Sequence, residues 1–398
     1  MKARARILLV TRNLPPLVGG MERLNWHMAE ELAKVADIRI VGPQGSGPLA
    51  PSGITVREAP LRPLWEFLWY ARGLTRREAK TWRPDIVLAG SGLTAPIARS
   101  AARACDARTA VYVHGLDVAV RHPAYCVMWL PSIRCADRII ANSNATAGLC
   151  RRIGVDPARI GIVHPGVDLP VEPHSPREQG RGEAPDSLYA AGFLERHASG
   201  DRPLLLSVGR LSARKGLREF VTYALPRIVA AKPGTALLIA GGPPNQALHA
   251  EAQTPELIQA AADASGVGGS IRFLGKVPDG ELADLYRIAD AHVFPVREIS
   301  NDPEGFGMVA VEAAAHGLPT VAFATGGVVD AVSDGRSGYL VRQNDYTALA
   351  DAILRTLSER EALRAPCVEF ARQFAWPEFG RQIIRQLELG RPLPGAGQ

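Results

Sequence analysis

Two glutamates in the segment NDPEGFGMVAVEAAAHGLPT (residues 301–320) have a spacing that suits binding of one extended, hydroxyl-rich ligand. Glu304 stands beside Gly305, and Glu312 follows eight positions later in a run of small apolar residues typical of a helix. Eight helical steps of about 100° would leave the two side chains about 80° apart, off a common face. We therefore expect Glu304 in the loop before a helix and Glu312 about two turns inside it. A ligand lying across the helix N-terminus can then touch both carboxylates.

Two cations in SVGRLSARKG (207–216) could bind the anionic part of such a ligand, because Arg210 and Lys215 follow an apolar strand pattern. A helix N-terminus with Gly305 and Gly307 would expose backbone N–H groups that also suit an anion. Together these features predict a diphosphate site, although two solvated surface cations are an equal alternative on spacing alone. Neither G-x-G-x-x-G nor the P-loop pattern occurs, so the site would differ from those of dehydrogenases and ATPases.

Short apolar runs alternate with longer helical patterns, which predicts parallel sheets covered on both faces by helices. The expected strands are residues 6–11, 37–42, 85–90, 109–114, 138–143, 159–164, 203–209, 236–241, 271–275, 291–296 and 319–324. The pattern restarts after a segment rich in Pro, Gly and charge. We predict an α/β chain with two doubly wound domains, residues 1–170 and 203–375. Residues 171–202 would form a linker with a short helix near 188–196, and 376–398 would return to the first domain. Ligands would bind at the carboxyl ends of the strands, in the cleft between the domains.

Composition favours a cytosolic protein without a metal cofactor. Hydrophobic residues make up 46% and charged residues 22% of the 398 residues, and no apolar run approaches the ~20 residues of a membrane span. The first apolar run is only a few residues long, so it reads as a strand and not as a secretion signal. Five cysteines without a C-x-x-C pair indicate reduced thiols, and D-x-D and H-E-x-x-H are missing from the sequence.

Charge is divided unevenly along the chain. Residues 1–168 carry 23 Lys/Arg and 13 Asp/Glu, a balance of +10, whereas the remainder carries 23 and 27, a balance of −4. The first half should therefore meet an anionic partner, and the second half need not.

Several segments in order resemble the retaining GT-B glycosyltransferases of family 4, over nearly the whole chain. EGFGMVAVEAAAHGLPT resembles the E-x7-E segment of that family, and VGRLSARKG resembles its phosphate-binding segment. PPLVGGMERLNWHMAEELA resembles the family's glycine loop and first helix, and VHGLD its H-G-x-D/E segment. IIANSNATAGL, VHPGVDL, FLGKVPDGELADLYRIADAHVFPV and FAWPEFGRQI resemble the remaining segments, with His164-Pro165 departing from the commoner Pro-Asn.

This resemblance implies a role for each matching residue. In the second domain, Arg210 and Lys215 would hold the donor diphosphate, Glu304 the donor sugar and Glu312 the ribose hydroxyls. The backbone of Gly305, Phe306 and Gly307 would meet sugar and phosphates, and Lys276 and Val277 would lie near the base. In the first domain, Gly19 and Gly20 would approach the phosphates, His114 the sugar and Asp117 the acceptor. From the residues alone, a histidine such as His114 at the end of an apolar strand is more often a hydrogen-bonded core residue, and the alternative for Asp117 is a cap of the next helix.

The mechanism implied by the resemblance is metal-independent transfer with retention of configuration. Breaking a glycosyl–phosphate bond develops positive charge on the sugar and negative charge on the phosphate, which cations and N–H dipoles can stabilise. The leaving phosphate would accept the proton of the acceptor on the same face. A double displacement through Glu304 is an open alternative.

A second feature, independent of these motifs, lies in RPLWEFLWYARGLTRREAKTWRPD (62–85). On a helix, Trp65 and Trp69 form one stripe that continues through four cations, Arg72, Arg76, Lys80 and Arg83. An aromatic patch that runs into a basic one suits an anionic membrane surface. The alternative, with equal weight, is that the tryptophans join the core and the cations face water.

The sequence therefore predicts a cytoplasmic glycosyltransferase, peripheral on the inner face of the membrane. It would use a UDP- or GDP-sugar and a hydroxyl acceptor that is lipid-linked or a polysaccharide or glycolipid precursor, and bind no nucleic acid. The two alternatives are a nucleotide-sugar 2-epimerase of the same fold and a non-catalytic sugar- or lipid-binding protein.

Overall fold

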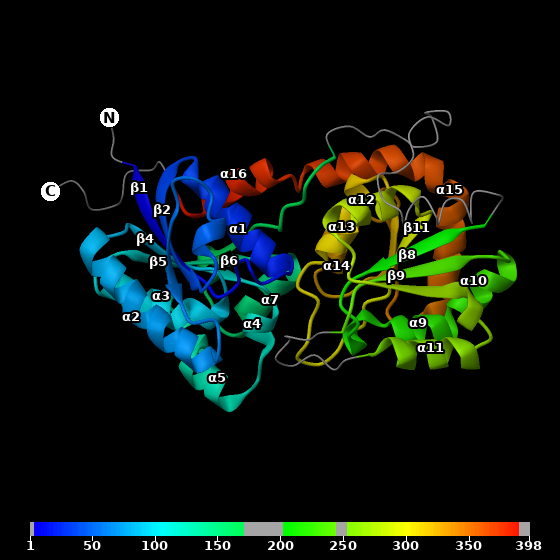
Figure 1. Ribbon diagram of the computed structural model, residues 1–398, viewed down its shortest axis with the longest axis horizontal. Helices are drawn as coiled ribbons and strands as arrows, with labels where there is room; N and C mark the ends of the chain where they lie inside the picture. Colours follow the sequence, from blue (N-terminus) through cyan, green and yellow to red (C-terminus); the bar gives the residue numbers. More distant parts are fainter. Residues whose placement is uncertain (1–3, 171–201, 244–252, 390–398) are drawn as a thin grey trace. The chain divides into compact units, whose positions relative to one another are not determined.

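The computed structural model of the chain describes residues 4–170, 202–243 and 253–389. By its internal contacts the chain divides into two compact units (Figure 1). Unit 1 is Met1–Gly166 together with Trp376–Gln398, and unit 2 is Val167–Ala375. The short helix predicted near 188–196, and the predicted linker up to residue 201, lie outside the described residues.

Unit 1 is built on a parallel sheet, which has seven strands within the described residues, in the order β3-β2-β1-β4-β5-β6-β7. Its strands are β1 (Ala5–Val10), β2 (Ala36–Pro43), β3 (Thr55–Ala59), β4 (Ile86–Ala89), β5 (Arg108–Val113), β6 (Arg138–Ala141) and β7 (Ile160–Ile162). β1 pairs in parallel with β2 on one side and with β4 on the other. The strand order therefore reverses beside β1, as in a doubly wound sheet.

Helices cover both faces of this sheet. They are α1 (Gly20–Ala33), α2 (Leu64–Trp82), α3 (Ala95–Arg103), α4 (Leu116–Ala119), α5 (Pro123–Met128), α6 (Leu130–Arg134), α7 (Asn144–Arg152) and α16 (Trp376–Gln386). α2 packs on α3 and α1 on α16, and Figure 1 shows these pairs on opposite faces of the sheet. α16 is held by stacking of the Trp376 and His27 rings, whose centroids are 4.0 Å apart. The end of the described chain thus completes unit 1.

Unit 2 repeats this plan with a parallel sheet in the order β10-β9-β8-β11-β12-β13, six strands in the described part of the chain. The strands are β8 (Leu204–Val208), β9 (Ala236–Ala240), β10 (Ile271–Gly275), β11 (Ala291–Phe294), β12 (Thr320–Phe323) and β13 (Gly338–Val341). β8 pairs with both β9 and β11, so the order reverses beside β8.

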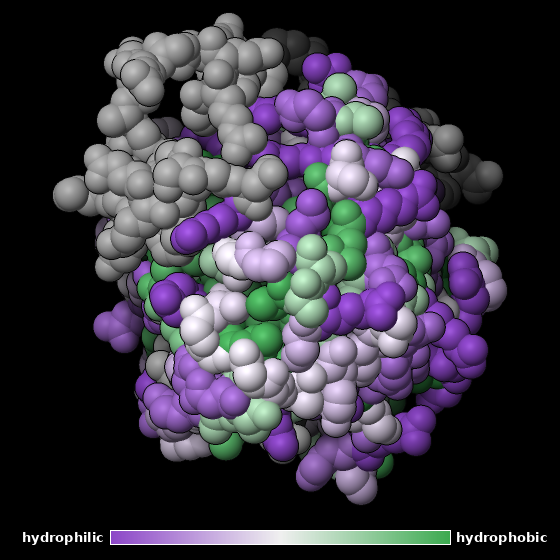
Figure 2. All heavy atoms as spheres, turned by 90° about the vertical axis from the view of Figure 1, so that its right-hand side faces the viewer, coloured by the Kyte–Doolittle hydropathy of each residue, from purple (hydrophilic) through white to green (hydrophobic). Residues whose placement is uncertain are grey.

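Strand alternation places two apolar cores on the two faces of this second sheet. Leu205 and Leu237 pack with α9, α10, α11 and the start of α15, whereas Leu204 and Leu206 pack with α12 and α13. The helices are α9 (Leu217–Tyr223), α10 (Leu225–Ala231), α11 (Pro255–Ala264), α12 (Asp279–Ile288), α13 (Met308–Ala315), α14 (Val328–Ala331) and α15 (Tyr346–Arg372). Figure 2 shows the face on the α10 and α15 side, where hydrophilic residues dominate and apolar ones form a narrow band.

The α/β architecture predicted from the sequence is confirmed, and each predicted strand is present within two residues of its expected ends. Two strands escaped prediction, β3 and β13, and both lie at the edge of a sheet. β3 (TVREA) carries charged, exposed residues, and β13 begins with a glycine. Neither is the continuous apolar run by which buried parallel strands are recognised.

Candidate functional site

The predicted phosphate segment leaves the sheet at the carboxyl end of β8. Arg210 is exposed, and a short 3₁₀ turn (Ala213–Lys215) then brings Lys215 back toward the loop after β11. Gly216 ends this turn with φ +67, and a Cβ there would lie 2.2 Å from the carbonyl oxygen of Pro295. The turn can pack this closely on the β11 loop only because residue 216 is a glycine.

Lys215 and Glu304 form the centre of a buried ion cluster. Lys215 Nζ lies 2.7 Å from Glu304 Oε2, and the two side chains are 13% and 12% exposed. Arg214 Nη1 donates to the same carboxylate oxygen, and Arg214 Nε lies 3.3 Å from Asp302 Oδ1. Lys215 Nζ also sits over the Phe294 ring, 4.4 Å from its centroid. The structure therefore brings together Lys215 and Glu304, and adds Arg214 and Asp302, which sequence reasoning missed.

Burial and charge compete in setting the pKa values of this cluster. Burial alone would raise the pKa of Glu304, but the charges of Arg214 and Lys215 outweigh it and lower that pKa to about 2. Burial lowers the pKa of Lys215 to about 8, opposed by the charge of Glu304. The carboxylate is thus firmly ionised at neutral pH, whereas the lysine titrates just above it.

Glu304 lies in the loop before α13, as the spacing predicted. Its backbone oxygen accepts from Gly327 N at 2.9 Å, and a Cβ at Gly327 would lie 2.1 Å from the oxygen of Gly305. The Gly326-Gly327 pair therefore supports the loop that carries Glu304. Gly307 precedes the helix with φ +98, and the Phe306 side chain is buried in the core. Any ligand contact at Phe306 thus belongs to its backbone.

Glu312 lies in α13, but nearer its start than expected. The helix begins at Met308, so Glu312 is its fifth residue, about one turn inside and not two. Its Oε2 accepts from Tyr286 Oη of α12 at 3.2 Å. The preceding β10–α12 loop carries exposed Lys276 and half-buried Val277, which packs on the core beneath α12. The residues predicted to contact the base lie in the β10–α12 loop, and the residue predicted to contact the ribose lies on α13.

The remaining predicted site residues follow the carboxyl ends of strands in unit 1. Gly19 and Gly20 are exposed at the start of α1, after β1. His114 follows β5, and its Nε2 lies 3.0 Å from the backbone oxygen of Gly90. Asp117 Oδ2 accepts from the backbone N–H of His114 at 3.0 Å, so it stabilises the turn before α4. His114 thus makes the hydrogen bond that its alternative interpretation expected, whereas Asp117 lies in the first turn of α4, whose N-cap is Gly115.

The stripe predicted on residues 62–85 lies on the surface helix α2. Trp65 and Trp69 are 67% and 68% exposed, whereas Phe67 and Ala71 face the core. The alternative in which the two tryptophans join the core is therefore wrong. Arg72, Arg76 and Lys80 continue the stripe on α2, and Arg83 is the residue directly after the helix; all four cations are exposed. No helix in the described ranges is both long and apolar enough to cross a membrane.

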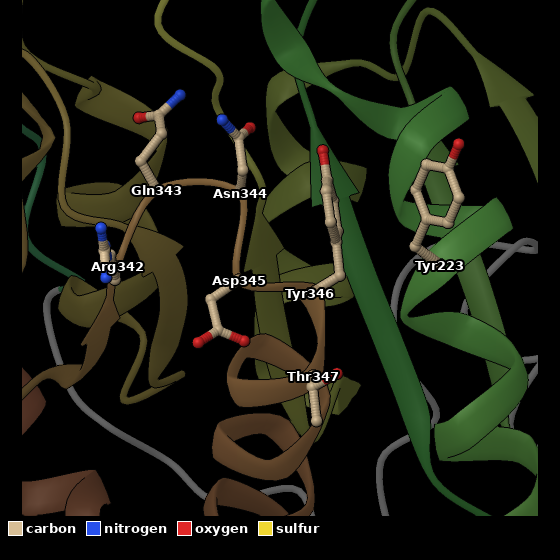
Figure 3. A pocket seen from close by; sticks show the side chains of 7 residues that line it. All are labelled: Tyr223, Arg342, Gln343, Asn344, Asp345, Tyr346 and Thr347. Atoms are coloured by element: carbon tan, nitrogen blue, oxygen red, sulfur yellow. The ribbon is translucent and has the colours of Figure 1, made fainter.

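A cavity of about 580 Å³ lies elsewhere in unit 2, where β13 leads into α15 (Figure 3). Its lining is polar and aromatic, and consists of Tyr223, Arg342, Gln343, Asn344, Asp345, Tyr346 and Thr347. None of the predicted donor residues lines it. Among the described residues, no group of three or more His, Cys, Asp or Glu side chains could hold a metal ion.

Two family models match successive parts of the chain. The Glycosyltransferase Family 4 model matches residues 18–170, and the Glycosyl transferases group 1 model matches residues 194–374. The chain belongs to the group 1, family 4 glycosyltransferases. The Arg214–Lys215–Glu304 cluster lies inside the group 1 match, and His114, Asp117 and α2 lie inside the family 4 match.

Curated relatives are about one third identical to this glycosyltransferase chain over the residues that align. D-inositol 3-phosphate glycosyltransferase of Mycolicibacterium smegmatis is 37% identical over 243 residues, covering 61% of this chain and 50% of the relative. The Actinosynnema mirum protein of the same name is 35% identical over 257 residues, covering 63% and 56%. The matches thus span about half the length of these relatives. The GDP-mannose-dependent alpha-(1-6)-phosphatidylinositol monomannoside mannosyltransferase of M. smegmatis is 29% identical and covers 87% of this chain and 88% of its own.

Solved structures confirm the GT-B fold. Anabaena HepE, in complex with UDP and glucose, aligns with a TM-score of 0.74 over 96% of this chain and 99% of its own, at 18% identity. WaaG, described as a glycosyltransferase involved in lipopolysaccharide biosynthesis, aligns with a TM-score of 0.61 over 97% and 100%, at 15% identity. At these identities the likeness concerns the fold alone.

Proposed function

We propose that this chain transfers a glycosyl group from a nucleotide diphosphate sugar to a hydroxyl acceptor, with retention of configuration and without a metal ion. The observation that carries the proposal is the cluster of Lys215, Arg214 and Glu304 beside exposed Arg210, at the carboxyl ends of two adjacent strands. Cations at this edge would stabilise the negative charge that develops on a departing diphosphate. An ionised carboxylate among them would accept hydrogen bonds from sugar hydroxyls.

The donor would extend from this cluster along the helix α13. Arg210 and Lys215 would hold the diphosphate, Glu312 the ribose, and the loop of Lys276 and Val277 the base. HepE is described in complex with UDP, and the mannosyltransferase relative is named as GDP-mannose-dependent. Both names support a nucleotide diphosphate donor, and they leave UDP and GDP as equal choices.

A front-face mechanism accounts best for the surroundings of Glu304. Two cations engage its Oε2 and hold its pKa at about 2. A carboxylate stabilised this strongly is a weak nucleophile, which disfavours double displacement through Glu304. The leaving phosphate would instead accept the acceptor proton on the same face. In unit 1, Gly19 and Gly20 would approach the phosphates, His114 the sugar and Asp117 the acceptor.

The acceptor is proposed to lie at an anionic membrane surface, on the cytosolic face. The support is the exposed stripe of α2, with Trp65 and Trp69 at one end and four cations along the rest. A relative whose name specifies a phosphatidylinositol mannoside is consistent with a lipid-linked acceptor. Neither the epimerase nor the non-catalytic alternative gains a supporting observation.

The test of the donor site is a thermal-shift screen over UDP- and GDP-sugars, followed by donor turnover with two variants. Glu304→Gln should lower kcat while nucleotide affinity is kept. Glu312→Gln should raise the donor KM with kcat kept, because ribose is held equally in ground and transition states. Wild-type kinetics in both variants would overturn the assignment of the two glutamates.

A further inference from the structure

Arg214 is the member of the ion cluster for which the predicted chemistry has no role. Its side chain is 9% exposed, and its Nη1 contacts the oxygen of Glu304 that Lys215 also contacts. Its Nε faces Asp302 at 3.3 Å, on the same loop as Glu304. The guanidinium therefore lies between the two carboxylates of the β11–α13 loop, hydrogen-bonded to Glu304 through Nη1 and in ion-pair contact with Asp302 through Nε, which makes no hydrogen bond itself.

Arg214 is held too firmly to act as a phosphate ligand itself. Its backbone oxygen accepts from Arg297 N at 2.8 Å, and its neighbour Gly216 is packed against Pro295. Arg210, by contrast, is exposed, and Lys215, although 13% exposed and paired with Glu304, carries a compact ammonium on a flexible four-carbon chain. Of the three cations, Arg210 and Lys215 can turn toward a ligand while Arg214 stays in place.

The charges in this cluster balance only while no ligand is bound. Arg214 and Lys215 face Glu304 and Asp302, two positive charges against two negative ones. A diphosphate that recruits Lys215 removes one partner from Glu304, whose side chain is 12% exposed. A buried carboxylate without a partner is strongly unfavourable, so another cation must remain on it.

We propose that Arg214, anchored by Asp302, is a positioning residue that keeps Glu304 paired and oriented while Lys215 turns to the donor diphosphate. The proposal rests on the proposed function and goes beyond it, because it assigns the residue that keeps Glu304 paired when Lys215 moves to the diphosphate, and so lowers the free-energy cost of that move. Arg214 touches no substrate in this scheme and acts through Glu304.

Removing Arg214 has a predictable electrostatic consequence. The charges that face Glu304 are Arg214, Lys215 and, farther off, Arg210, and all three lower its pKa against the effect of burial. Asp302 pairs with Arg214 Nε. His292, near Lys215, is neutral because burial and the charge of Lys215 lower its pKa to about 3. Loss of Arg214 therefore raises the pKa of Glu304, by about 1 to 3 units for a charge this close.

The experiment compares wild type with Arg214→Met, Arg214→Lys and Asp302→Asn. The control is Arg227→Met, which removes an exposed guanidinium of α10 paired with Asp351. Donor turnover is measured from pH 4.5 to 9, and UDP and GDP affinity by calorimetry at pH 7, with circular dichroism to select folded variants. In Arg214→Met an acid limb of kcat/KM should appear toward pH 4.5, as the pKa of Glu304 rises from about 2 to as much as about 5, whereas the wild-type profile stays level there. Nucleotide affinity should fall about tenfold.

The other variants separate charge from anchoring. Arg214→Lys should recover part of both losses, because it restores the charge beside Glu304. Asp302→Asn should lower kcat with little shift of the acid limb, since Arg214 stays charged but loses its anchor.

A folded Arg214→Met with wild-type pH profile and affinity would overturn the positioning role, and so would an equal shift in Arg227→Met. If Arg214→Met does not fold, a wild-type kcat in Asp302→Asn refutes it. Wild-type protein that binds neither nucleotide refutes the proposed function instead.

Discussion

Arg210 and Lys215 follow the same strand but have different surroundings, and we predict a phosphate contact for each. Arg210 is exposed, whereas Lys215 is 13% exposed and paired with Glu304. Arg210→Ala or Lys215→Ala should weaken nucleoside diphosphate binding about 10- to 150-fold, since a charge-assisted hydrogen bond contributes ~1.5–3 kcal/mol. Nucleoside binding should change little. Calorimetry with both ligands is the measurement, and equal losses for nucleoside and diphosphate would contradict a phosphate contact.

Lys215 also predicts a pH dependence. Burial lowers its pKa to about 8, so the ammonium is intact below pH 8 and is lost above it. A diphosphate prefers the charged lysine, so its affinity should be constant between pH 7 and 8 and then fall by up to about tenfold per unit. Calorimetric titrations from pH 7 to 10 measure this decline. Lys215→Arg, which stays charged, should abolish the decline, and a flat wild-type profile up to pH 10 would exclude the lowered pKa.

Arg214 and Asp302 illustrate which part of the site could be predicted from residues. Lys215 and Glu304 were found because each stands in a recognisable segment with fixed spacing. Arg214 stands next to Lys215 and Asp302 two positions before Glu304, and in the sequence alone their charges read as solvated. The sequence does contain a pattern that could have predicted the cluster: two adjacent cations in one loop, Arg214 and Lys215, and an Asp-x-Glu in another loop. That signal becomes meaningful only once β8 and β11 are known to be neighbours.

At the scale of elements, apolar runs predicted the interior of both sheets and one edge strand of each, but missed the other edge strands, β3 and β13. β8 and β9 are buried throughout and were located within one residue. Most side chains of β3 are exposed, because the strand lies at the edge of the sheet and has a neighbouring strand on one side only. No apolar run therefore marks it in the sequence. α2 was predicted from its stripe, yet periodicity alone left open which face meets the core. The burial of Phe67 and Ala71 decides that question.

The exposed stripe of α2 predicts binding to anionic lipid. Trp65 and Trp69 can lie at the headgroup boundary while the four cations face acidic headgroups, each contributing about 1 kcal/mol. The attraction should fade with salt, because the Debye length falls from ~10 Å at 0.1 M to ~3 Å at 1 M. The protein should therefore sediment with anionic liposomes at low salt, much less with neutral ones, and dissociate at high salt.

A matched pair of variants tests whether α2 is responsible. Replacing Arg72, Arg76, Lys80 and Arg83 with Gln should abolish sedimentation and leave donor hydrolysis intact, because none of the proposed donor residues is among these four or lies on α2. Replacing four exposed cations of unit 2 with Gln should leave sedimentation unchanged: Arg227, Arg272, Arg355 and Arg372. Wild-type protein that ignores anionic liposomes at low salt would point to an acceptor that is not membrane-bound.

At the scale of the whole molecule, the two halves of the chain differ both in net charge and in the function proposed for them. Residues 1–168, most of unit 1, carry the balance of +10, and the rest of the chain carries −4. The positive half contains α2, and the half with net negative charge contains Arg214 and Lys215 at the carboxyl end of β8. The excess charge thus serves the proposed membrane contact, while the donor site depends on a local cluster and not on net charge.

This local cluster leads to a prediction about the complete reaction. Arg210 and Lys215 provide at the carboxyl end of β8 the positive charge that a divalent ion provides in metal-dependent transfer. The rate should therefore be unchanged by EDTA and by added Mg²⁺ or Mn²⁺. With the leaving phosphate accepting the acceptor proton on the same face, ¹H NMR of the first product formed should show the anomeric configuration of the donor. Glu304→Gln should slow this reaction without changing the configuration, because in the proposed front-face mechanism Glu304 is not the nucleophile. An inverted product would contradict the front-face mechanism, and loss of activity in EDTA that Mg²⁺ restores would contradict the proposal that cationic side chains replace a metal ion.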